Sequence, residues 1–141
     1  MKNKWFKLIS QFPEGLQDEI NQERPNGEDE AIEEMESFYL VSKEPIEFKL
    51  SNIVDDNLFG LTRVPQDVLD VINKKWELNV KTEIVYDENP DRYFKYSKMP
   101  NHTAKPSVMF DGEIGWGWGR FIAALIRGDK TILAWELRSK K

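Results

Sequence analysis

The chain has 141 residues, of which 40% are apolar and 32% are charged, proportions typical of one globular domain. It has no cysteine, which excludes disulfides and thiolate chemistry, and a single histidine, which excludes a multi-histidine metal site within one chain. The longest apolar run has six residues, far short of the ~20 that cross a bilayer, and no signal-peptide stretch opens the chain. We therefore expect a soluble, cytoplasmic protein without a membrane partner.

The net charge of −5 is unevenly distributed along the chain. Residues 1–40 carry a net charge of −6, whereas residues 116–141 carry +4. Apolar residues at helical spacing precede Pro13, which should end a first helix before a second begins. A third helix is expected over 28–39, where acidic side chains suit the helix N-terminus. We interpret residues 1–44 as an acidic helical extension of a domain that spans the remainder of the chain.

Strands and helices are expected to alternate after residue 44. Pro65 suits the first turn of a helix, Asp111-Gly112 is a strong hairpin signal, and Gly128 stands where helices commonly end. The expected elements are a strand at 45–50, a loop or short turns at 51–65, a helix at 65–78, a strand at 80–86, a loop at 87–106, a hairpin at 108–118, a helix at 120–127 and a strand at 131–137. This order predicts an α+β fold with a mixed sheet and flanking helices.

A run of alternating glycine and tryptophan leads into the helix expected at 120–127. Gly115, Gly117 and Gly119 would let the backbone approach a ligand, and the helix N-terminus favours an anion. Arg120, at the first turn, offers a planar fork that can bind phosphate through two donors. These residues are therefore candidate phosphate ligands. The alternative is a purely structural strand, with its glycines where other groups approach and Trp116 and Trp118 on one face of the sheet.

The segment 45–137 resembles the superfamily of ParB N-terminal domains and sulfiredoxins. Its element order is similar, and the run from Gly117 to Arg120 resembles the Gly-Glu-Arg-Arg motif of that family, with Trp118 and Gly119 in place of the central residues. The resemblance implies a ParB/sulfiredoxin-like fold and binding of a nucleoside triphosphate such as CTP or ATP with Mg²⁺. The absence of cysteine excludes sulfiredoxin chemistry.

Three side chains are candidates for acid–base or metal-assisted catalysis. Asp111 is in the expected hairpin turn and Glu113 directly follows it, and His102 lies in the expected loop with an ordinary pKa near neutrality. The alternative is that Asp111 is a turn residue, that Glu113 is an exposed strand residue and that His102 is solvated. Lysines and aromatic residues interleaved between 93 and 105 could follow single-stranded nucleic acid, although acidic neighbours also fit a solvated loop.

Two functions from different classes follow from these patterns. The first is a small ParB-like protein that binds a nucleotide or phosphate, with phosphotransfer or association with DNA left open. The second is a non-enzymatic interaction or inhibitor protein that binds a host protein or mimics DNA through its acidic extension. Either would suit an accessory protein of a phage or mobile element. The sequence leaves the oligomeric state open.

Overall fold

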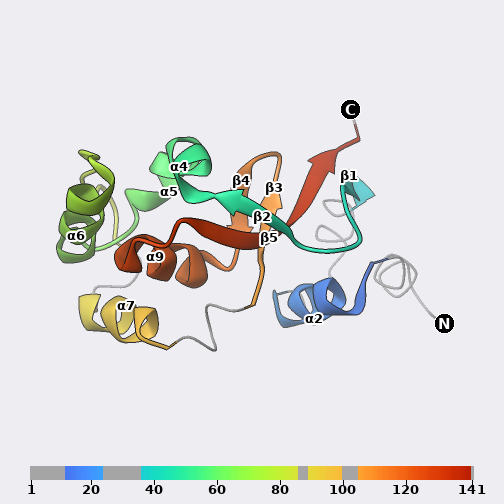
Figure 1. The fold of residues 1–141 in the computed structure, drawn as a ribbon, viewed down its shortest axis with the longest axis horizontal. Coiled ribbons are helices and arrows are strands. Elements are labelled where there is room, and N and C mark those ends of the chain that lie inside the picture. Colours follow the sequence, from blue (N-terminus) through green and yellow to red (C-terminus); the bar gives the residue numbers. More distant parts are fainter. Residues whose placement is uncertain (1–11, 24–35, 86–88, 100–104, 141) are drawn as a thin grey trace.

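The computed structural model describes residues 12–23, 36–85, 89–99 and 105–140. Within these ranges the fold is mixed α+β, with a five-stranded sheet and six α-helices (Figure 1). In chain order the elements are α2 Glu14–Glu23, β1 Phe38–Leu40, β2 Ile46–Lys49, α4 Leu50–Ile53, the 3-10 turn η1 Asp55–Asn57, α5 Leu58–Leu61, α6 Gln66–Trp76, α7 Pro90–Ser97, β3 Ser107–Phe110, β4 Glu113–Trp116, α9 Trp118–Arg127 and β5 Thr131–Ser139.

The last strand, β5, organises the sheet. Along one edge it pairs antiparallel with β2 near its start and with β1 near its end. Along its other edge it pairs parallel with β3, which continues antiparallel to β4. A mixed sheet therefore forms around β5, as the element order predicted.

Two apolar clusters lie on opposite faces of this sheet. Successive strand residues point to opposite faces, and Ala134 and Trp135 belong to different clusters, as do Met109 and Val108. The larger cluster packs α4, α5, α6 and α9 against the sheet, and the smaller one holds α2. Figure 1 accordingly shows α2 apart from α6, α7 and α9, which gather at the other end of the molecule.

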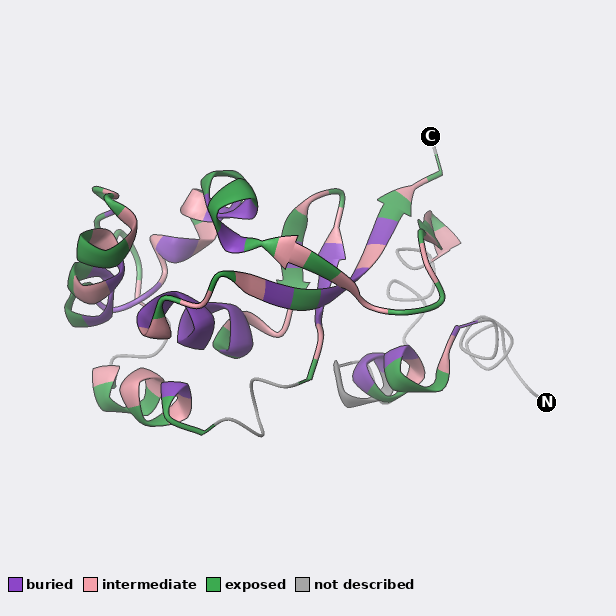
Figure 2. Ribbon diagram, in the orientation of Figure 1, coloured by how far each residue is buried: buried purple, intermediate pink, exposed green. Residues whose placement is uncertain are grey.

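Elements with strong local sequence signals form as predicted. The hairpin turn has positive φ at both Asp111 and Gly112, the backbone that this dipeptide favours. Helix α9 ends where Gly128 takes a left-handed conformation and donates its N–H to Ala124 and Leu125 carbonyls. Seven consecutive α9 residues are buried, starting at Arg120, because the helix is apolar around most of its surface (Figure 2).

Two predictions for the middle of the chain are wrong. Residues 80–85 form no strand, because their backbone bonds go elsewhere: the Val80 N–H donates to the Asn73 side chain, and the Thr82 N–H to the Gln66 side chain. The expected loop at 87–106 contains helix α7. Asn89 caps that helix by accepting from the Asp91 N–H, and Pro90 supplies its first turn.

The described part of residues 1–44 contributes one helix that packs on the sheet and one strand that pairs within it. Helix α2 follows Pro13 as expected, and Leu16 and Ile20 are fully buried. Most of the helix expected over 28–39 lies outside the described residues, but its last residues form strand β1 instead, paired with β5. Both segments contribute to the smaller apolar cluster, so the described part of residues 1–44 packs with the rest of the fold.

No helix in the described ranges combines the length and apolar character needed to cross a membrane.

Candidate functional site

The three glycines at 115, 117 and 119 differ in how strongly the local structure requires glycine at their positions. Gly117 has φ +84, and a Cβ there would meet Ser107 at 2.8 Å from Oγ and 3.0 Å from Cα. Gly115 is the extra residue of a β-bulge, because Trp116 pairs with Val108 while Ile114 pairs with Met109. Gly119 is exposed and has ordinary space around it, since a Cβ would lie 3.6 Å from the nearest ring atom, on Tyr96.

The bulge also separates the two tryptophans of the run. Strict alternation would place Trp116 on the same face as Ile114, but the extra residue turns it to the other face. There it contacts Phe110 edge to face, in the smaller apolar cluster. Trp118 begins α9 and packs against Phe121 in the larger cluster. The two indoles therefore do not share one face of the sheet.

Arg120 is engaged by the protein itself. Its two terminal nitrogens each lie 2.9 Å from a carboxylate oxygen of Glu19 in α2, and one also donates to the Pro106 carbonyl. Both side chains are about nine-tenths buried or more. The guanidinium that the sequence predicted as a phosphate ligand therefore forms an ion pair with a carboxylate of the same chain. A phosphate would have to be bound by other cations of the chain.

Two of the three catalytic candidates, Asp111 and Glu113, lie within the described residues. Asp111 accepts hydrogen bonds from the Ser139 N–H and hydroxyl, both at 2.8 Å. These bonds, the backbone one first, hold the pKa of Asp111 below its usual value. Glu113 is exposed at the start of β4, and His102 lies outside the described residues. No group of three or more His, Asp or Glu side chains suited to a metal occurs within the described ranges.

The interleaved lysines and aromatic residues lie on and beyond helix α7. Tyr93 and Phe94 pack against the larger apolar cluster, whereas Lys95 on the same helix and Lys98 just after its end are exposed. Lys105 is exposed at the end of the following segment. Two of the three aromatic rings are therefore partly used in packing, which favours the structural interpretation of this segment.

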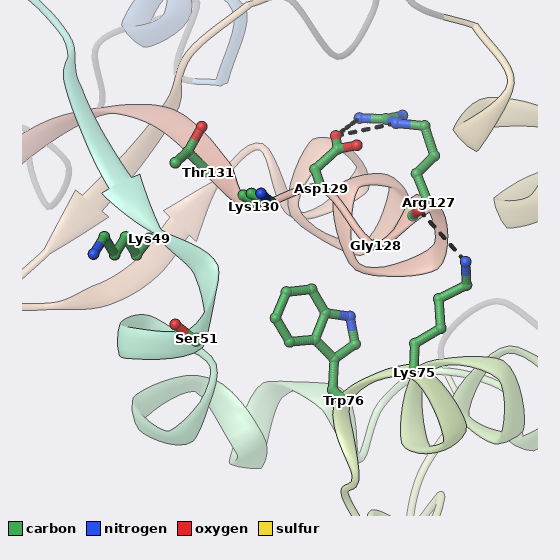
Figure 3. A pocket seen from close by; sticks show the side chains of 9 residues that line it. All are labelled: Lys49, Ser51, Lys75, Trp76, Arg127, Gly128, Asp129, Lys130 and Thr131. Atoms are coloured by element: carbon green, nitrogen blue, oxygen red, sulfur yellow. Dashed lines mark hydrogen bonds and ion pairs between the residues drawn. The ribbon is translucent and has the colours of Figure 1, made fainter.

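A cationic hollow, which we call the basic pocket, lies at the other end of α9 from the glycine run. Its volume is about 660 Å³. Figure 3 shows the indole of Trp76 rising from α6 toward the turn between α9 and β5. The described residues that line the pocket are Lys49, Ser51, Lys75, Trp76, Arg127, Gly128, Asp129, Lys130 and Thr131.

Two of the cations in the basic pocket are tied to neighbouring groups. Arg127 binds Asp129 through two nitrogens, at 3.1 and 2.5 Å, and donates a third bond to the Ser97 carbonyl. The Lys75 ammonium lies 3.4 Å from the Arg127 carbonyl. By contrast, the side chains of Lys49 and Lys130 have no hydrogen-bond or ion-pair partner within the described structure.

The indole of Trp76 is fixed in place. Its Nε1–H donates to the Leu125 carbonyl at 2.9 Å, which ties the ring to α9 while leaving it half-buried at the pocket. Gly128 is required by its φ of +77 rather than by a close approach, because a Cβ there would make only ordinary contact with the Lys75 side chain, 3.5 Å from Cδ. The pocket therefore offers an oriented aromatic ring beside cationic groups.

Electrostatics favour an anion in the basic pocket. Four cations against the single carboxylate of Asp129 give its lining a net charge of +3. The pocket also lies at the C-terminal ends of α6 and α9, each of which contributes the equivalent of about −0.5 charge. The side-chain cations outweigh this contribution and leave about +2. A net positive charge therefore remains in the basic pocket after the negative helix ends have been neutralised.

Comparison with known proteins identifies no relative. No family model, curated protein or solved structure matches the chain. The resemblance to ParB and sulfiredoxin domains stays a prediction, and the candidate site rests on the geometry of this molecule.

The sequence interpretation missed the basic pocket because its cations come from separate elements. Lys49 ends β2, Lys75 lies in the last turn of α6, Arg127 ends α9, and Lys130 precedes β5. One available signal was the net charge of +4 over 116–141, which includes two of these cations. Lys49 and Lys75 join them only through the pairing of β2 with β5 and the packing of α6 on α9.

Proposed function

We propose that this protein binds a phosphate-bearing small molecule of the nucleotide class in the basic pocket. The observation that carries the proposal is that four cations, Lys49, Lys75, Arg127 and Lys130, line one hollow that is also lined by the indole of Trp76. The resemblance to ParB-type domains independently suggests a nucleotide, although it placed the phosphate at the glycine run.

Each part of the proposed site has a distinct task. Lys49 and Lys130 carry ammonium groups without protein partners, so they are the proposed phosphate ligands. Trp76 supplies a flat surface on which a base can stack, an interaction worth about 1–3 kcal/mol per base. Arg127 is the positioning residue, because its bonds to Asp129 and the Ser97 carbonyl hold the end of α9 in place.

Magnesium has one candidate carboxylate in this arrangement. Asp129 lines the pocket, but its Oδ2 already accepts both bonds from Arg127. The proposal therefore relies on direct contacts between ammonium groups and phosphate, and a nucleotide would bring its own Mg²⁺. Binding should consequently occur with and without added Mg²⁺.

Calorimetric titration of the full chain with ATP, CTP, GTP and inorganic phosphate tests the proposal. Lys49→Gln and Lys130→Gln should each weaken nucleotide binding about tenfold, the loss expected for one charge-assisted hydrogen bond. Lys43→Gln changes an exposed lysine outside the pocket and serves as the matched control. Absence of binding at millimolar nucleotide, or equal binding by all three variants, would contradict the proposal.

Trp76→Phe tests the aromatic part separately. This change removes the Nε1–H bond to Leu125 and shortens the stacking surface, so affinity for nucleotides should fall while affinity for inorganic phosphate is retained. Equal losses for nucleotide and phosphate would show that the ring does not contact a base.

A further inference from the structure

The lysines of the basic pocket fall into two groups that different elements hold. Lys49 ends β2 and Lys130 precedes β5, and the pairing of these strands positions both, with the Leu50 N–H donating to the Lys130 carbonyl at 3.0 Å. Lys75 instead lies in the last turn of α6. In Figure 3 its ammonium lies to one side of the Trp76 indole and that of Lys49 to the opposite side. The pocket therefore has a sheet side and a helix side, with an aromatic ring between them.

Lys75 is held on the helix side by the end of α9. Its side chain lies against Gly128, with Nζ 3.6 Å from the place where a Cβ would stand. The ammonium lies 3.4 Å from the Arg127 carbonyl, a long contact that uses at most one of its three donors. Among the described residues it has no further hydrogen-bond or ion-pair partner. The helix side therefore has donors that can bind a second anionic group.

This arrangement restricts the chemistry of the ligand. A nucleoside 5′-diphosphate or 5′-triphosphate carries all its phosphates on one side of the sugar, so it can reach the cations of only one side of the ring. A nucleotide with phosphates on both the 3′ and the 5′ oxygen carries charge on two sides. The volume of about 660 Å³ is about twice the lower end of the range for small-molecule sites, which leaves room for the second phosphate.

Resting on the nucleotide-binding function proposed above, we propose that the basic pocket takes a nucleotide with a phosphate at both its 3′ and its 5′ oxygen. The base stacks on Trp76, Lys49 and Lys130 bind one phosphate, and Lys75 binds the other. Two sources supply this chemistry: a free nucleoside 3′,5′-bisphosphate, and an internal nucleotide of a single-stranded nucleic acid. Proteins that bind single strands likewise combine aromatic stacking with cations that follow the backbone.

Calorimetric titration of the full chain with AMP, ADP and adenosine 3′,5′-bisphosphate tests this inference. ADP and the bisphosphate carry the same number of phosphates in different places. The bisphosphate should bind about tenfold more tightly than AMP, the effect of one charge-assisted hydrogen bond. Lys75→Gln should remove this gain but preserve the gain of ADP over AMP, because the second phosphate of ADP lies on the sheet side. Lys74→Gln changes the exposed neighbouring lysine outside the pocket and should preserve both gains.

The trinucleotide dApdApdA separates the two sources, because its central nucleotide has a phosphate on each side. Tighter binding of this trinucleotide than of the bisphosphate, with an affinity that falls as salt rises, would assign the site to a single strand. Tighter binding of the bisphosphate would assign it to the free nucleotide. In either case Lys75→Gln should weaken binding of the tighter ligand.

Two results would overturn this inference while leaving the nucleotide proposal standing. The first is equal affinity of the unaltered protein for AMP and the bisphosphate. The second is an equal effect of Lys75→Gln on the gains from ADP and from the bisphosphate, which would reduce Lys75 to a general contribution of charge. Absence of binding by every nucleotide in the series would contradict both proposals.

Discussion

Glu19 and Arg120 form a buried ion pair between residues 101 positions apart in the chain, with both N–O distances at 2.9 Å. The pair joins α2, which packs on one face of the sheet, to the start of α9, which packs on the other. Its side chains are 7% and 10% exposed, so neither charge has substantial access to water. The arginine of the glycine run therefore has a structural partner, and this moves the candidate phosphate site to the opposite end of α9.

Removing one partner of this pair should destabilise the fold strongly. Arg120→Met leaves the buried carboxylate of Glu19 unpaired, and we expect a loss of about 3–5 kcal/mol in the free energy of unfolding. The double variant Glu19→Leu/Arg120→Met should recover much of that loss, because replacing both charges leaves no unpaired one. Urea unfolding of both variants measures the effect. A cost below about 1 kcal/mol for Arg120→Met would indicate a solvated pair of little energetic weight.

The glycine run should respond in opposite directions at two positions. Gly117→Ala requires a left-handed alanine, which costs roughly 1–2 kcal/mol, and also forces its Cβ against Ser107. Gly119→Ala places an alanine in the first turn of α9 with ordinary space around it, so stability should rise by up to about 1 kcal/mol. Thermal unfolding compares the two. Equal destabilisation by both changes would be inconsistent with the structural reasons given for these glycines.

Asn57 should be an important stabilising residue at the edge of the sheet. Its buried amide donates to the Ile53 carbonyl at 2.7 Å and accepts the Ile114 N–H of β4 at 2.7 Å. Asn57→Ala leaves that strand N–H without its partner, and we expect a loss of about 1–3 kcal/mol. Asn52→Ala, at an exposed position in α4, is the matched control and should change stability by less than about 0.5 kcal/mol. Denaturant unfolding distinguishes them, and similar losses for both would be evidence against this role.

Asp111 should make stability depend on pH at the acidic end of the range. Its pKa is lowered in the folded protein, so the stabilising contribution is present above the unfolded value of about 3.9 and is lost as pH falls through the folded pKa. Asp111→Asn tolerates the left-handed turn and should remove this part of the acid-induced loss. Unfolding measured from about pH 5 downward provides the test. Ser139→Ala removes one of the two donors and should give an intermediate profile; identical profiles for all three proteins would contradict the prediction.

Elements with complete local signals could be predicted from the sequence. Helix α6 has Pro65 before its first turn and an apolar stripe, and the hairpin has Asp111-Gly112 at its turn. Helix α7 also had such signals, an Asn-Pro pair followed by aromatic residues, but surrounding prolines and polar residues obscured them. Residues 80–85 alternate like a strand, yet side chains of α6 bind their backbone, and nothing local in the sequence reveals that partner.

Predicting the site required knowledge of tertiary contacts to a greater extent than predicting the fold did. Whether Arg120 is available to a ligand is decided by Glu19, which lies in a different helix and near the other end of the chain. The cations of the basic pocket likewise come together only through strand pairing and helix packing. A glycine run before a helix predicted the helix correctly, but its spacing carried no information about the partner of its arginine.

The most direct test of the central claim is a crystal structure of the full chain soaked with ATP or CTP. We predict phosphate density at Lys49 and Lys130 with the base against Trp76, and an intact pair between Glu19 and Arg120. Phosphate density at the N-terminus of α9 with Glu19 displaced from Arg120, or no nucleotide density at millimolar concentration, would contradict the account.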